Sequence, residues 1–195
     1  KDSCLALWRA RNAGMAVPLL ITAMDEDGRK SRSHGVPPEL LAAQAASLGA
    51  RLQRYHASWA SYEEQFIAML RAAKADGMDH ALFGDIDLQP HRDWEEKVCA
   101  AAGLTAHLPL WGEARRALVD EFLAAGFKAI VVCINGQHLP REFCLREFDA
   151  SFLADLPPGV DGCGENGEFH TFVYDGPAFS APVALRRKQV LQYDA

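Results

Sequence analysis

The chain has 195 residues, a size that suits one α/β domain with a small appendage. Hydrophobic residues make up 49% and charged residues 24%, so a sizeable buried core is expected. The net charge of −6 excludes a general attraction to nucleic acid or to anionic membrane surfaces. We therefore expect neither partner, and any anionic ligand needs a local site.

The five cysteines include no C-x-x-C pair, which fits neither a disulfide framework nor a tetrahedral zinc site. Unpaired cysteines suit a reducing cytosol, and the sequence shows neither an apolar stretch as long as a membrane span nor a signal peptide, so we expect a cytoplasmic protein. The chain starts at Lys1 without a methionine and runs directly into a helical pattern. We expect further residues ahead of Lys1.

Helical and strand-like segments alternate over the first 134 residues. The apolar run 17–24 is typical of a strand buried on both faces, and Pro37 and Pro38 suit the first turn of a helix. Ser61 and Glu64 form a capping-box pattern before the next helix. In chain order, helices are expected at residues 2–14, 37–49, 61–77, 90–102 and 113–125, and strands at 17–24, 51–57, 80–86, 107–110 and 127–134.

This alternation predicts βαβ units in a mostly parallel sheet, with helices on both faces. The pattern fades after about residue 150, where 168–174 and 183–192 are expected as strands of a closing antiparallel element. We therefore divide the chain into a sheet domain, residues 1–150, and a small α+β segment, residues 151–195. Such sheets bind ligands beyond the carboxyl ends of their strands.

Lys1, Asp2 and Ser3 form a candidate phosphate site at the start of the first helix. The free N–H groups of a first turn and the helix dipole favour an anion, and Lys1 adds a positive charge. Asp2 would repel a phosphate unless Mg²⁺ lies between them. The alternative interpretation is an ordinary capped helix.

Two loops at strand ends carry further candidates. Residues 31–35, S-R-S-H-G, suit contact with a phosphate or a ribose, or else form a solvated surface loop. Gly84 allows a ligand close to the backbone, and Asp85 suits a metal or ribose contact, although both also fit a turn. Arg92 suits a bidentate clamp on a carboxylate or phosphate. Trp59, Trp94 and Trp111 are expected to serve packing rather than nucleotide stacking.

Polar groups are densest in residues 163–171, C-G-E-N-G-E-F-H-T. Strand alternation from Glu168 puts Glu168 and His170 on one face, where they could share a proton or hold a polar substrate. A decorated β-turn is the alternative, but the density of reactive groups favours a substrate site. Its residues are Glu165, Asn166, Gly167, Glu168, His170 and Thr171.

These motifs together resemble the PP-loop ATP pyrophosphatases, and among them the diphthine–ammonia ligase group. Residues 1–7, K-D-S-C-L-A-L, resemble the tail of an SGGKDSxxAL loop, whose S-G-G and preceding strand would lie ahead of Lys1. Seven further motifs follow in family order, starting at residues 31, 83, 91, 109, 127, 164 and 175: S-R-S-H-G, F-G-D-I, H-R-x-W-E-x-x-x-C, P-L-W, F-K-A-I-V-V-C, G-E-N-G-E-F-H-T and D-G-P.

The resemblance implies a Rossmann-like fold of the HUP type that binds ATP and Mg²⁺. It implies that a substrate carboxylate is adenylated with release of pyrophosphate, and that ammonia then displaces AMP to form an amide. By family pattern, the nucleotide is expected to contact Lys1, Asp2, Ser3, Ala23, Met24, His34, Gly35, Gly84 and Asp85, and the metal to contact Asp2 and Asp85. The acceptor is expected to contact Arg92 and residues 165–171. The catalytic residues are expected to be Lys1, Asp2, Glu168 and His170, and Glu165 is expected to help hold ammonium.

One departure concerns the acceptor. Members resembling the eukaryotic and archaeal ligases read E-G-G-E-Y-E-T, whereas residues 165–171 read E-N-G-E-F-H-T, as in bacterial members. Because bacteria lack diphthamide, the carboxylate acceptor, a small molecule or a protein, is expected to be a different one. The alternative function is a module that senses ATP or AMP without turnover. Family habit favours a homodimer.

Overall fold

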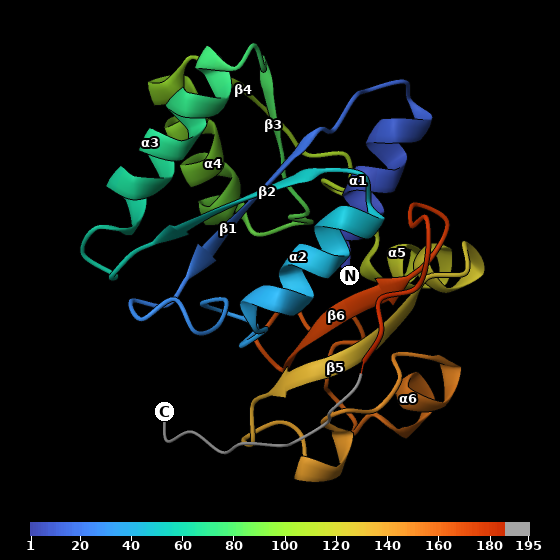
Figure 1. Cartoon of the computed structure of the whole chain (residues 1–195). Helices are drawn as coiled ribbons and strands as arrows, with labels where there is room; N and C mark the ends of the chain where they lie inside the picture. The colour runs from blue at the N-terminus through green and yellow to red at the C-terminus, as the bar shows by residue number, and fades with distance from the viewer. Residues whose placement is uncertain (186–195) are drawn as a thin grey trace.

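The computed structural model describes residues 1–185, in which helices and strands alternate as the sequence predicts (Figure 1). None of the helices in this part of the chain has the length and apolar character of a membrane span. The helices are α1 (Asp2–Asn12), α2 (Pro38–Ser47), α3 (Tyr62–Ala75), α4 (Gln89–Ala102), α5 (Arg115–Ala124) and α6 (Ala150–Asp155), with a 3-10 turn, η1 (Arg141–Phe143). The strands are β1 (Leu19–Met24), β2 (Arg51–His56), β3 (His80–Leu82), β4 (Thr105–His107), β5 (Lys128–Ile134) and β6 (Phe169–Asp175).

The first four strands form two parallel pairs. β1 pairs with β2 along its whole length, and β3 pairs with β4. In residues 1–185 these pairs belong to separate two-stranded sheets. Parallel pairing is thus confirmed, whereas the described residues do not form the continuous sheet expected for a HUP fold.

A cavity of about 780 Å³ lies between the two pairs. Residues of β1 and of β3 both line it, and its wall continues onto α1, α3 and α4. Neither β1 nor β3 has a second partner strand among the residues described. The facing edges of the two pairs therefore have unpaired backbone groups next to an apolar space, lined in part by Leu7, Leu20, Ile21, Phe66, Leu82 and Phe83.

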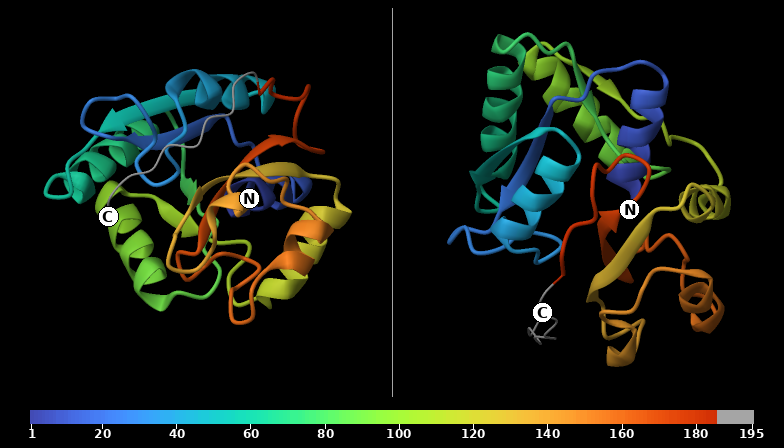
Figure 2. Two further views of the ribbon diagram at one scale, coloured as in Figure 1. Left: turned by 90° about the horizontal axis from the view of Figure 1, so that it is seen from below. Right: turned by 45° about the vertical axis from the view of Figure 1, so that its right-hand side comes forward.

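Helices cover the parallel pairs from both sides. In Figures 1 and 2, α2 lies on one side of the β1–β2 pair, and α3 and α4 lie on the other. α3 and α4 pack on each other and bury Leu70, Val98 and Cys99 against β3 and β4. This arrangement leaves α1 free to meet the C-terminal part of the chain.

The C-terminal part is built on an antiparallel pair. β5 pairs with β6, from Lys128 opposite Asp175 to Ile134 opposite Phe169. The assignment of residues 127–134 to the parallel sheet is therefore wrong; an apolar run reports burial on both faces, not strand direction. The partner expected for β6, residues 183–192, lies mainly outside the described residues.

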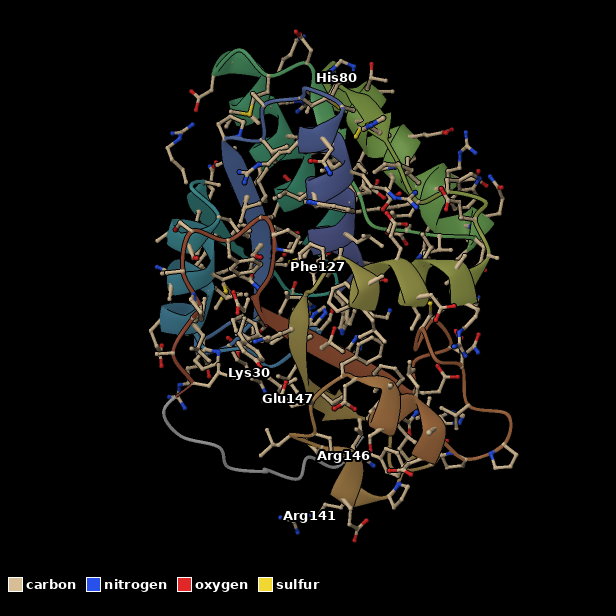
Figure 3. The ribbon with its side chains drawn as sticks, turned by 90° about the vertical axis from the view of Figure 1, so that its right-hand side faces the viewer. Lys30, His80, Phe127, Arg141, Arg146 and Glu147 are labelled. Carbon is tan, nitrogen blue, oxygen red and sulfur yellow. The ribbon has the colours of Figure 1, made fainter. Side chains whose placement is uncertain are left out.

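Phe127, just before β5, joins this pair to the rest of the protein. Its ring packs edge-on against Trp8 of α1, with centroids 6.0 Å apart, and stacks on Phe122 of α5 at 4.8 Å. Figure 3 shows Phe127 where α1 and α5 meet the antiparallel pair, between His80 and Arg141 at opposite ends of the molecule. The helix α1 thereby packs against the C-terminal part on one side and against β3 on another.

Candidate functional site

The candidate site is built around the first turn of α1. The ammonium group of Lys1 donates to both carboxylate oxygens of Asp2 at 2.9 Å and to the carbonyl oxygen of Cys163. It also lies 3.9 Å from a carboxylate oxygen of Glu165. Only 5% of the Lys1 side chain is exposed. The start of α1 and the motif at 163–171, which are far apart in sequence, therefore lie in direct contact.

The charges of this pair stabilise each other. Burial alone would raise the pKa of Asp2, but the charge and hydrogen bonds of Lys1 lower it below its ordinary value. Burial likewise opposes the charge of Lys1, yet Asp2 raises the Lys1 pKa. Both groups therefore stay ionised, and Lys1 is a positive charge available to a phosphate at the helix N-terminus.

Gly84 brings the end of β3 against this turn. A Cβ atom on Gly84 would lie 2.6 Å from the backbone nitrogen of Ser3 and 2.8 Å from the carbonyl carbon of Asp2. Only glycine permits this approach, because both neighbours are backbone atoms. The predicted nucleotide residues Ser3, Gly84 and Asp85 are brought together, and all three line the cavity.

Asp85 is held by two side chains of α4. His91 Nδ1 lies 2.8 Å from Asp85 Oδ1, and Glu95, 4% exposed, is hydrogen-bonded to the Asp85 carboxylate. Burial, together with that contact, raises the pKa of Glu95 to about 9. Glu95 therefore keeps its proton at neutral pH, beside Asp85 in the cavity wall.

We call residues 161–168 the acidic loop. Glu168 stabilises this loop from inside by accepting hydrogen bonds from its backbone amides. It is 2% exposed. Its Oε1 accepts from the Asp161 amide at 3.0 Å, and its Oε2 accepts from the Asn166 amide at 2.9 Å. Burial alone would raise its pKa, but these amide donors lower it. The sequence predicts a catalytic role for Glu168, whereas its contacts are those of a residue that holds the loop closed.

Glu165 is the carboxylate of this loop that reaches the reactive groups. Its side chain is 16% exposed and faces Lys1. Burial, with the negative charge of Asp2 next in effect, raises the pKa of Glu165 to about 7, and Asp85 contributes in the same direction. A carboxylate with a pKa near neutrality is suited to accept a proton in a reaction.

β6 adds His170 and Thr171. The rings of His170 and His34 lie 4.7 Å apart between centroids, which brings the S-R-S-H-G loop to this strand. Burial lowers the pKa of His170, so its imidazole is neutral. The hydroxyl oxygen of Thr171 accepts a hydrogen bond from the Lys1 backbone nitrogen at 2.8 Å. Both residues therefore face the first turn of α1.

Other predicted residues lie apart from this group. Arg92 pairs with Glu96 at 2.7 Å and lies over the ring of Trp111, so its guanidinium is engaged by these two residues of the described chain. The carbonyl of Ala23 already accepts the Arg32 amide at 3.0 Å.

Met24 is 1% exposed and bridges to Ser31, and Gly35 donates its amide to the same serine within the loop. The adenine contacts expected at Ala23 and Met24 stay a prediction. Trp59 is 79% exposed, so the prediction that it serves packing is wrong.

Magnesium fits this site only together with a nucleotide. Within residues 1–185, no three His, Cys, Asp or Glu side chains converge as a protein-only metal site. Mg²⁺ is commonly bound by one or two carboxylates with phosphate oxygens and water completing its octahedron. Asp2 and Asp85 suit such a site, because Gly84, the residue before Asp85, packs directly against the backbone of Asp2.

The sequence does not predict a role in the site for three residues that the structure places there: Glu95, Arg115 and Asp161. Glu95 stands in the H-R-x-W-E motif beside the residues that were selected, so the motif itself is the signal. Arg115 and Asp161 are 46 positions apart in the chain and carry no local pattern. Only the fold brings them together.

Comparison with known families accounts for both halves of the site. Residues 1–106 match the diphthamide synthase N-terminal domain, and residues 114–192 match the diphthamide synthase C-terminal domain. The chain belongs to the diphthamide synthase family. The Lys1 turn and Gly84 lie in the first matched region, and the acidic loop lies in the second.

Curated relatives of this family carry the name diphthine–ammonia ligase. The protein of Schizosaccharomyces pombe is 29% identical over 108 residues, which cover 51% of this chain and 17% of that protein. The Danio rerio protein is 30% identical over 96 residues, which cover 46% of this chain and 37% of that protein. The Mus musculus protein is 28% identical, with 51% and 39% covered. The matched part thus spans well under half of each relative.

Proposed function

We propose that this chain forms an ATP-dependent ligase that adenylates a carboxylate and converts it to an amide with ammonia. Membership of the diphthamide synthase family supports ATP and ammonia as substrates. The single observation that carries the proposal is the position of Glu165, 3.9 Å from the Lys1 ammonium group at the N-terminus of α1. One place thus combines an anion site with a carboxylate suited to proton transfer.

The nucleotide phosphates lie at the first turn of α1 in this proposal. Lys1, 5% exposed and charged, and the free amides of the turn bind the pyrophosphate portion. Mg²⁺, held by Asp2, Asp85 and phosphate oxygens, would neutralise the charge that develops on that leaving group. An oxygen of the acceptor carboxylate attacks the α-phosphorus, the bond to the bridging oxygen breaks, and pyrophosphate leaves.

Ammonia acts in the second step. Its nitrogen attacks the acyl carbon of the adenylate, the bond to the AMP oxygen breaks, and an amide and AMP are formed. Ammonium must lose one proton before its nitrogen can attack, and the attacking nitrogen must lose another as the amide forms. Glu165, whose pKa lies near 7, accepts the proton of the attacking nitrogen. The neutral His170 lies on the same side to orient the acceptor.

A further parallel strand completes the site. The cavity between β1 and β3 has two unpaired strand edges and an apolar wall, which together suit an extended segment. We propose that residues ahead of Lys1 form this strand and carry the S-G-G of the PP-loop to the first turn of α1. The division into residues 1–150 and 151–195 belongs to the same proposal, as does an acceptor other than diphthine.

The competing function is a nucleotide sensor. His170 stands where ligase-like members have glutamate, and a changed acceptor site is also what loss of turnover would leave behind. A sensor binds ATP or AMP but releases no pyrophosphate with any carboxylate or amine.

The deciding experiment supplies the full-length protein with ATP labelled at the α-phosphate, Mg²⁺, ammonium and a pool of cell metabolites. We expect AMP formation that requires the pool and ammonium and that is lost in Asp2→Asn. Release of ADP would contradict the ligase, and binding without AMP under every pool would favour the sensor.

Two glutamate variants separate chemistry from loop structure. Glu165→Gln is expected to lower AMP formation by about a hundredfold, the usual effect of removing a general base, with little change in stability. Glu168→Gln, three positions on, is expected to lower the free energy of unfolding by about 1–3 kcal/mol, because buried amides lose their carboxylate. The reverse pattern would return the catalytic role to Glu168.

A further inference from the structure

Arg115, in the first turn of α5, binds two separate acidic residues. Its Nε and Nη2 atoms donate to the two oxygens of Asp87, each at 2.7 Å, and its Nη1 donates to Asp161 Oδ2 at 2.7 Å. The side chain is 26% exposed. Its neighbour Arg116 is 78% exposed and pairs only with Asp120, one turn along the same helix, in the contacts described. Two adjacent arginines therefore differ in what they hold together.

Asp161 passes this contact on to the acidic loop. Its Oδ1 accepts from the Cys163 amide at 3.0 Å, and its Oδ2 accepts from the Glu165 amide at 3.2 Å as well as from Arg115. The Cys163 thiol donates to the carbonyl oxygen of Arg115 at 3.1 Å. A single carboxylate thus separates the guanidinium from the backbone of Glu165.

Asp87 ties the same guanidinium to the nucleotide side. It follows Asp85 by two residues, and the intervening Ile86 is fully buried, so this segment has little freedom to move. Gly84 at its start packs against the backbone of Ser3. The loop after β3 is therefore fixed to the first turn of α1 at one end and to Arg115 at the other.

These contacts close a ring. From Lys1 and Ser3 it runs through Gly84 to Asp87, across Arg115 to Asp161, and through Glu165 back to Lys1. We propose that Arg115 is a positioning residue that couples the loop after β3 to the acidic loop and thereby keeps Glu165 beside Lys1. Its importance for turnover rests on the proposed ligase function, but the coupling itself does not.

Arginine is suited to this position for a geometric reason. Its planar guanidinium offers a bidentate face to Asp87 and a further N–H to Asp161, whereas a lysine ammonium is a point charge without a fixed fork. Lysine is therefore expected to keep one of the two carboxylates in place and to lose the coupling only in part.

The test compares Arg115→Gln and Arg115→Lys with the matched control Arg116→Gln in the full-length protein. The readout is the alkylation rate of Cys163, 3% exposed in the acidic loop, followed by mass spectrometry with and without Mg-ATP. Cys99, 1% exposed in α4, reports global opening in the same sample. Local opening of a loop changes such rates without unfolding of the whole protein.

We expect Arg115→Gln to speed labelling of Cys163 by about tenfold while Cys99 changes little, with Arg115→Lys intermediate and Arg116→Gln at the wild-type rate. We also expect Mg-ATP to slow labelling of Cys163 in the wild type but not in Arg115→Gln. Should Arg115→Gln fail to fold, Asp87→Asn, which leaves the Arg115–Asp161 bond, takes its place with the same expected direction.

Unchanged labelling of Cys163 in Arg115→Gln, or an equal increase at both cysteines, would overturn the proposal. If the ligase function holds, Arg115→Gln is further expected to raise the KM for ammonium by about tenfold while the Kd for ATP stays unchanged. Labelling of Cys163 needs no turnover, so absence of AMP formation would refute the ligase function but leave the proposed coupling through Arg115 standing. A lower Tm as the only effect of Arg115→Gln would contradict the coupling.

Discussion

Glu95 is a buried carboxyl group whose state depends on its surroundings rather than on its type. It is 4% exposed, it contacts Asp85, and its Oε2 atom has no hydrogen-bond partner among the residues described. Burial raises its pKa from an ordinary 4.5 to about 9. At neutral pH the folded protein therefore keeps a proton that the unfolded chain releases.

This difference makes stability depend on pH. Between pH 4.5 and 9 unfolding releases the Glu95 proton, so the free energy of unfolding falls as pH rises through this window. Glu95→Gln removes the titration and keeps the shape. We expect the stability of the wild type to fall relative to Glu95→Gln by about 1 kcal/mol or more from pH 6 to pH 9, measured by urea unfolding without metal.

Glu96→Gln is the matched control, because Glu96 is the next residue and its side chain is 51% exposed. It should track the wild type at every pH. Parallel stability curves for wild type and Glu95→Gln would mean that Glu95 is ionised in the folded protein.

At the scale of elements, the contact between the end of β3 and the start of α1 decides the shape of the site. Gly84 lies so close to Ser3 that a Cβ would stand 2.6 Å from a backbone nitrogen. Backbone atoms cannot turn aside as a flexible side chain does, so the two elements would have to move apart. The ring of contacts through Arg115 depends on this approach.

Gly84→Ala is therefore expected to lower the free energy of unfolding by about 1–3 kcal/mol, the usual effect of overpacking, and to weaken ATP binding. Chemical denaturation and calorimetric titration with Mg-ATP measure the two effects. Gly136→Ala is the control, since a Cβ there meets nothing within 4 Å. Equal behaviour of the two variants would show that the approach of β3 to α1 is not tight in solution.

At the scale of the whole molecule, the main feature is the cavity of about 780 Å³ between two parallel pairs. Backbone groups of β1 and β3 that face it have no partner strand in the part of the chain described. Unpaired strand edges beside apolar surface are unfavourable for an isolated domain. A parallel strand in this space would pair both edges and join the two halves of the sheet.

Hydrogen exchange tests this strand directly. With the residues expected ahead of Lys1 present, the amides of β1 and β3 that β2 and β4 leave unpaired should become strongly protected, because they enter a ladder. Amides of the β5–β6 pair should exchange at the same rate with or without those residues. Fast exchange along β1 and β3 in the longer protein would rule the strand out of the cavity.

Local order of the chain could be predicted from the sequence. The helix starts and ends, the parallel direction of the first four strands and the family follow from apolar periodicity, prolines, glycines and motif order, all of which act over a few neighbouring residues. The capping box predicted at Ser61 is not formed, because the Ser61 side chain makes no cap hydrogen bond to α3. The candidate turn at Lys1–Ser3 and the polar segment at 163–171 belong here as well, because both are dense local patterns.

Only the tertiary structure decided how these pieces meet. The antiparallel partner of β5, the separate roles of Glu165 and Glu168, and the bridge from Asp87 through Arg115 to Asp161 depend on residues up to 164 positions apart, counting from Lys1 to Glu165. The two glutamates of this motif look alike in sequence, yet Glu168 accepts hydrogen bonds from backbone amides of the loop, whereas Glu165 faces Lys1. Burial and hydrogen-bond partners assign such roles, and both arise only when distant segments pack together.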